Sequence, residues 1–185
     1  MRVKIQPEQQ IQRINHLKNV LKEYASLSDE LLIQRPNEKS WSVLEVIKHM
    51  SIGHLAYREK IKNALANTED KVQKIDELSC TVIPNYLIKR FPPSEGKIRF
   101  KMKTTKKFQP MIMEEQVPSA MVISELEECL DELKGWVDYY RTEPISLRKF
   151  NSAVGAMVRF NIPEACEFIL CHNERHFYQI EKILK

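Results

Sequence analysis

Four stretches of the chain repeat apolar residues every three or four positions, which is the period of an α-helix with one buried face. They cover residues 7–25, 42–66, 119–143 and 161–185. Glycine and proline are sparse, at 4 and 9 residues, and no stretch alternates apolar and polar residues as a half-buried strand does. Segments of about 20 residues are about 30 Å long as helices, so the pattern predicts an all-α fold, a four-helix bundle.

Local signals place the helix ends. A capping box joins a polar N-cap residue to an acidic residue three positions later, and three such pairs occur. They are Ser42 with Glu45, Ser124 with Glu127, and Asn161 with Glu164. Between the second and third long helices the period is lost, and residues 71–90 read as partly helical with a break near Pro84.

The lengths of the connections predict the topology. The first and third joints have roughly 15 to 20 residues, whereas the second has about 50, enough to return along the whole bundle. We therefore expect helices two and three to run parallel, in an up-down-down-up arrangement with a long crossover. Residues 1–185 are predicted to form one domain.

Charge and hydropathy make some partners less favoured than others. The chain has 29 basic and 25 acidic residues, and the positive excess lies in residues 89–107. No aromatic stacking pattern accompanies these charges, so a solvated loop is favoured over nucleic-acid binding. No run of 18 apolar residues occurs and the N-terminus lacks a signal-peptide core, which predicts a cytoplasmic protein without a membrane partner.

Cysteine usage agrees with a reducing compartment. The four cysteines form no C-x-x-C pair, and a chain of this size does not need disulfides to fold. We expect reduced, buried side chains at all four positions. They are Cys80, Cys129, Cys166 and Cys171.

Candidate chemistry is concentrated in the last helix. His172 and His176 lie one turn apart within its apolar stripe, so both can reach a common ion. Such a pair also arises by chance, and a catalytic zinc usually has three protein ligands. The second helix offers His49 and His54. The helical wheel places His54 near the centre of the apolar stripe and His49 on its flank, where it can face a second neighbouring helix.

Two further side chains are candidates for the surroundings of such an ion. Tyr57 lies one turn beyond His54 and can orient substrate or donate a proton, although a core role is also typical at that spacing. Gln179 faces inward next to His176 and can hold it by a hydrogen bond. No side chain stands out as a general base, so the catalytic residues are not assigned.

Three motifs in order resemble the DinB-like family of small bacterial metal-binding bundles. They are Trp41-Ser-Val-Leu-Glu-Val-Ile-Lys-His49, Lys106-Lys-Phe-Gln-Pro110 and His172-Asn-Glu-Arg-His176-Phe-Tyr-Gln-Ile180. The resemblance implies a four-helix bundle with a divalent ion, often zinc or nickel, bound by His49, His172 and His176. His54 then becomes a candidate for the second shell or the substrate pocket and the reserve ligand.

The same resemblance implies the range of possible reactions. Some relatives look like thiol transferases that use glutathione, mycothiol or bacillithiol, and others look like hydrolases or isomerases. We therefore expect a metal-dependent thiol (S-)transferase or hydrolase that acts on a small electrophilic substrate, with a low-molecular-weight thiol as co-substrate in the first case. The alternative is a non-catalytic metal-binding or interaction bundle. The family also implies a homodimer.

Overall fold

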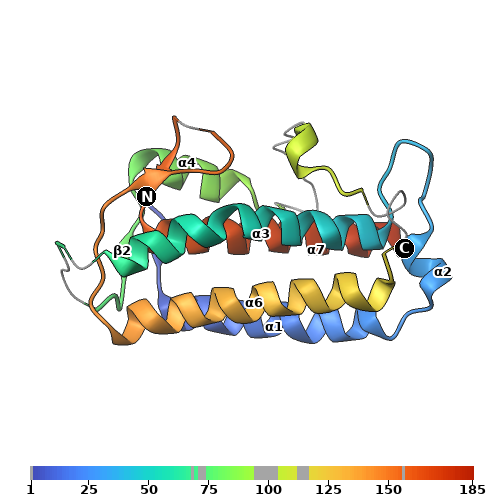
Figure 1. Cartoon of the computed structure of the whole chain (residues 1–185), viewed down its shortest axis with the longest axis horizontal. Helices are drawn as coiled ribbons and strands as arrows, with labels where there is room; N and C mark the ends of the chain where they lie inside the picture. Colours follow the sequence, from blue (N-terminus) through green and yellow to red (C-terminus); the bar gives the residue numbers. More distant parts are fainter. Residues whose placement is uncertain (1, 68, 71–73, 94–103, 112–116, 156) are drawn as a thin grey trace.

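The computed structural model describes residues 2–67, 69–70, 74–93, 104–111, 117–155 and 157–185. Within these residues, four long helices are accompanied by short helices and strands in the connections (Figure 1). The long helices are α1 (Pro7–Ala25), α3 (Val43–Ala66), α6 (Ser119–Thr142) and α7 (Ile162–Ile183). The short ones are α2 (Asp29–Ile33), α4 (Val82–Arg90) and the 3-10 turn η1 (Lys106–Phe108). The predicted all-α four-helix bundle is confirmed.

In the described parts of the connections, two short pairs of antiparallel strands are present. β1 (Lys4–Ile5) pairs with β2 (Leu78–Ser79), and β3 (Phe150–Asn151) pairs with β4 (Arg159–Phe160). The second pair forms a hairpin immediately before α7, in a connection for which the sequence analysis assigned no element. Within the basic segment 89–107, residues 94–103 lie outside the described residues.

Two predicted capping boxes form at the starts of α3 and α7. The Ser42 hydroxyl accepts the Glu45 amide, and Glu45 accepts the Ser42 amide at 2.8 Å. In α7, Asn161 Oδ1 accepts the Glu164 amide at 3.0 Å, and Glu164 accepts the Asn161 amide at 3.2 Å. Each box satisfies two backbone donors that would otherwise lack partners at the helix start. The two helices that carry the candidate histidines therefore start at defined residues.

Two predicted boundaries are wrong. Ser124 and Glu127 do not cap α6, because that helix already starts at Ser119 and both residues lie inside it. Pro84 does not break a helix either. It lies in the first turn of α4, where the backbone nitrogen has no helical acceptor and a proline costs little.

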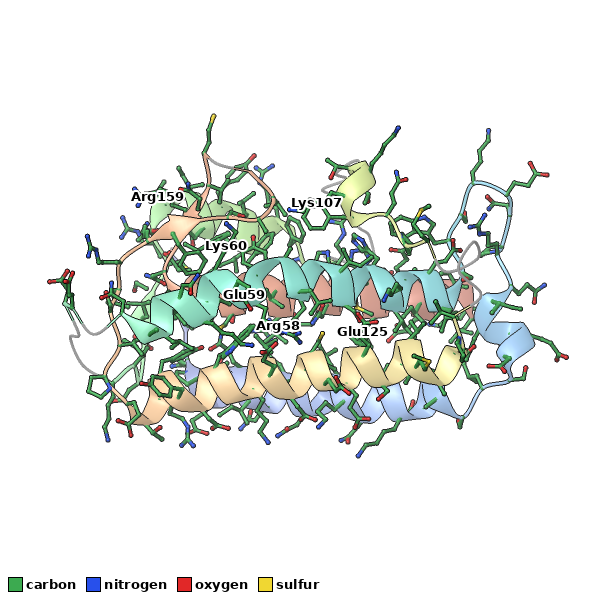
Figure 2. The ribbon with its side chains drawn as sticks, viewed as in Figure 1. Arg58, Glu59, Lys60, Lys107, Glu125 and Arg159 are labelled. Carbon is green, nitrogen blue, oxygen red and sulfur yellow. The ribbon has the colours of Figure 1, made fainter. Side chains whose placement is uncertain are left out.

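Ion pairs along the helices show their directions. Lys48 and Arg58 of α3 pair with Glu125 and Glu132 of α6, each at 2.6 Å, so these two helices run parallel. Figure 2 shows Arg58 and Glu125 in the layer between the two helices. The colours in Figure 1 show α1 and α7 running the other way, with α3 and α7 on one side of the bundle and α1 and α6 on the other. The antiparallel neighbours α3 and α7 provide the candidate site.

The space between the long helices is filled by apolar side chains, among them Ile47, Leu126, Leu130 and Ile180. All four cysteines are free and buried, as predicted. None of the described helices has both the length and the apolar composition needed to cross a bilayer.

Candidate metal centre

The packing of α3 against α7 brings three histidines together. His49 comes from α3, and His172 and His176 lie one turn apart on α7. One ring nitrogen of each can be chosen so that all three lie within 4.8 Å of one another. The ring centroids are 5.2 Å apart for His49 and His172, 4.7 Å for His49 and His176, and 4.5 Å for the α7 pair. The structure thus brings together the three residues that the sequence motifs indicated.

Hydrogen bonds on the outer ring nitrogens hold two of these imidazoles. His49 Nδ1 lies 2.7 Å from the backbone carbonyl oxygen of Phe108, which can only accept, so Nδ1 carries the proton. His176 Nδ1 lies 2.9 Å from the side-chain oxygen of Gln179 and donates in the same way. In both rings the Nε2 lone pair is left for an ion, which is the tautomer that metal-bound histidines usually adopt. The Trp41 ring also packs against the His49 ring, with 5.0 Å between the ring centroids.

Gly53 lets the third imidazole lie close to α3. It is one turn beyond His49, on the same face of the helix. A Cβ atom at this position would lie 3.3 Å from His172 Cε1, closer than ordinary van der Waals contact. The absence of a side chain at Gly53 therefore leaves room for the His172 ring beside α3.

The electrostatic environment keeps the three rings neutral. Burial lowers the pKa of His49 below its ordinary value. Burial, together with the nearby His49, lowers the pKa of His172 to about 3, and burial with both neighbouring rings lowers the pKa of His176 strongly. Neutral imidazole is the form that binds metal ions. Three neutral nitrogen donors are chemically compatible with a divalent ion such as zinc or nickel, so the residues present fit such an ion.

A cavity of about 330 Å³ adjoins the three histidines. Its volume falls at the lower end of the range for small-molecule pockets. The histidines form one part of its wall. Further residues of α3 and α7, the residue that follows α4, the η1 region and the loop between β3 and β4 form the rest. Its apolar lining includes Phe91, Phe108, Val154, Phe168 and Ile169.

The remaining predicted site residues divide into two groups. Gln179 bonds to His176, and Tyr57 lines the cavity with its hydroxyl 2.5 Å from the Ser152 hydroxyl. His54 is not brought to this cluster. Its ring stacks on Trp136 of α6 at 4.8 Å, and its Nε2 lies 2.9 Å from Glu132. His54 lies five positions after His49 on α3, which turns the two side chains about 140° apart and toward different neighbours.

Four features of the site were missed in the sequence analysis. They are the Phe108 carbonyl, Gly53, Lys107 and Arg175, the last two being cavity-lining cations. Helical spacing could have identified Gly53, which is four residues after His49, and Arg175, which is three residues after His172. The carbonyl gives no signal of its own, since every residue carries one.

Comparison with known proteins supports the fold. YfiT from Bacillus subtilis, described as a probable metal-dependent hydrolase with an unusual four-helix bundle topology, superposes with a TM-score of 0.60. The superposition covers 96% of this chain and 85% of that protein, at 13% sequence identity. At that identity the likeness shows a shared fold. No protein-family model and no curated protein matches the sequence.

Proposed function

We propose that this chain is a DinB/YfiT-like metal-dependent enzyme whose divalent ion, zinc or nickel, is held by His49, His172 and His176. The observation that carries the proposal is the convergence of three neutral imidazoles at the wall of a cavity. A structural metal site is closed, with four protein ligands, whereas a catalytic site retains an open position. The cavity beside the histidines therefore favours an enzyme over a non-catalytic metal-binding bundle.

The reaction we propose is hydrolysis of a small electrophilic substrate such as an ester or amide. YfiT, which has the same fold, is described as a probable metal-dependent hydrolase. A divalent ion in the site would supply Lewis-acid activation of water and of the substrate carbonyl. Transfer of a low-molecular-weight thiol to an electrophile is the alternative reaction at the same open position.

The chain's own residues would bind the substrate and limit its access to water. Phe91 and Phe168 provide apolar walls. Tyr57 remains protonated at neutral pH because burial raises its pKa to about 12, so it can donate a hydrogen bond but cannot act as a base. None of the described residues that line the cavity carries a carboxylate. Within the described part of the chain, the cavity thus offers hydrogen-bond donors and cations to a substrate.

Metal analysis of the purified protein tests the site. We expect about one equivalent of zinc or nickel by elemental mass spectrometry, and His172→Ala should lose it because two imidazoles bind weakly. His16→Ala is the control, since His16 is exposed on α1 and far along the chain from the cluster. Metal content that is unchanged in His172→Ala would refute this ligand set.

Activity assays then separate the two reactions. The loaded protein should hydrolyse simple nitrophenyl esters in the absence of thiol if it is a hydrolase. Thiol transfer should instead require glutathione, mycothiol or bacillithiol together with an electrophile. If neither assay responds in a metal-loaded sample, the non-catalytic binding bundle becomes the better interpretation.

A further inference from the structure

Among the described residues that line the cavity, two have charged side chains, and both are cations. Lys107 is exposed on η1 and Arg175 is half-buried on α7. Figure 2 shows Lys107 on η1, on the side of α3 that faces away from α6. The two cations come from distant segments of the chain, so the fold gathers them at the same cavity that the histidines line.

The acidic residue next to Arg175 in the sequence does not neutralise the cavity. Glu174 accepts two hydrogen bonds from the Arg13 guanidinium, at 2.6 and 2.7 Å, and so points toward α1. Arg13 also binds Glu167, which keeps that carboxylate on the same side of α7. These two carboxylates of α7 thus bind Arg13 of α1, while Arg175 of the same helix lines the cavity.

The aromatic wall holds the Arg175 guanidinium in place. Its central carbon lies 5.4 Å from the centroid of the Phe91 ring, and Phe91 in turn packs edge-on against Phe168 at 4.8 Å. A guanidinium over an aromatic face keeps its charge and its planar set of donors, which match the two oxygens of a carboxylate or phosphate. The cavity therefore combines an apolar wall with a cation suited to binding an oxyanion.

The proposed ion would add to this positive charge. Its three ligands are neutral imidazoles, so they leave the two positive charges of a divalent ion uncompensated. A site of this kind attracts and orients anions, because the charges lie beside a low-dielectric wall.

We propose that the substrate is a small anionic molecule, with an apolar body against Phe91 and Phe168 and a carboxylate or phosphate group bound by Arg175 and Lys107. This inference rests on the proposed function, since it defines the substrate class of the same site. It predicts that the cavity discriminates by charge between molecules of equal shape.

Benzoate and benzamide provide that comparison, because they have nearly the same shape and only benzoate is charged. Phenyl phosphate tests the second oxyanion. Binding of each to the full chain is measured by calorimetry, as purified and after chelator dialysis, with the metal content determined in the same samples. We expect benzoate or phenyl phosphate to bind about tenfold or more tightly than benzamide. Whichever of the two binds better identifies the oxyanion.

Variants assign the preference to the two cations. Arg175→Gln and Lys107→Gln should each reduce the preference for the anion, and Arg175→Lys should retain part of it. Lys106→Gln is the matched control, because Lys106 is a neighbouring exposed lysine of η1 that does not line the cavity. Lys107 is also exposed, so its replacement should not disturb folding.

Three results would overturn the inference. They are equally tight binding of benzamide and both anions, no binding of any of the three at millimolar concentration, and survival of the preference in the Arg175→Gln/Lys107→Gln double variant. The last result, seen only in metal-containing samples, would assign anion binding to the ion alone and leave the metal proposal intact. Conversely, a protein that holds no metal as purified and still prefers benzoate through Arg175 would support the anion site while contradicting the metal centre.

Discussion

Gly53→Ala tests whether the close approach of His172 to α3 is needed for metal binding. The change adds one methyl group at 3.3 Å from His172 Cε1, where the ring must move by a few tenths of an ångström. The ring is also confined by its two partners, with centroids at 5.2 Å for His49 and 4.5 Å for His176. It therefore cannot move without changing the arrangement of the three nitrogens.

The expected effects on folding and on metal affinity differ. Alanine is favoured over glycine inside a helix by about 1 kcal/mol, and the atom that the new methyl meets is at the end of a side chain. The metal-free variant should thus be about as stable as the parent. Metal affinity requires ligand distances within about 0.2 Å of their ideal values, and misplaced imidazoles typically lower it roughly 10- to 100-fold. We expect a loss of about tenfold for Gly53→Ala.

Gly135→Ala is the matched control. Gly135 also lies inside a long helix, α6, but a Cβ atom there would have no neighbour within 4 Å. It should gain up to about 1 kcal/mol in the free energy of unfolding and leave metal affinity unchanged. Zinc affinity is measured by competition with a chelating dye, and stability by urea denaturation in the presence of chelator. Equal zinc affinity of the two variants would refute the role assigned to Gly53.

Two further substitutions probe the surroundings of the site. Gln179→Leu should lower metal affinity by roughly tenfold in the same dye competition, because His176 loses the acceptor at its Nδ1; unchanged affinity would mean that packing alone orients the ring. For His54, burial lowers the pKa from 6.5 to about 4 in the folded state, so the unfolded chain takes up the proton first and stability falls as the pH drops from about 6.5 toward 4. His54→Gln should flatten that part of the curve of unfolding free energy against pH, measured by urea denaturation without metal; a curve parallel to that of the parent would contradict this assignment.

The helices and their caps were predictable because they depend on local sequence. The boxes at Ser42 and Asn161 were found correctly, since cap and partner lie three residues apart. The capping box predicted at Ser124 was wrong, because a polar residue followed by an acidic residue three positions later also occurs inside helices. The helix break predicted near Pro84 was wrong for a related reason. Proline is compatible with the first turn of a helix, and the sequence alone did not show where α4 begins.

The choice between His49 and His54 shows where helical periodicity stops being informative. α3 contacts α6 on one side and α7 on the other, so its buried surface is wide and contains both histidines. Helical periodicity identifies this buried surface as a whole. It does not show which part of the surface contacts α6 and which part contacts α7. The resemblance to the DinB-like family, counted from Trp41, favoured His49, and His49 is the histidine of α3 that lies beside His172 and His176. The single-domain organisation, the cytoplasmic location and the homodimer stay predictions.

The hydrogen bond from His49 to the Phe108 carbonyl should tolerate substitutions at position 108 better than insertions or deletions nearby. Any amino acid at position 108 supplies a carbonyl, so replacing that side chain leaves the acceptor in place, whereas a deletion or insertion in the crossover would displace it. The two interactions are also thermodynamically linked. If the hydrogen bond to Phe108 strengthens ion binding by His49, then ion binding stabilises the position of η1 by the same free energy. Chain length in the crossover, rather than residue identity at its contact point, thus governs this part of the coordination chemistry.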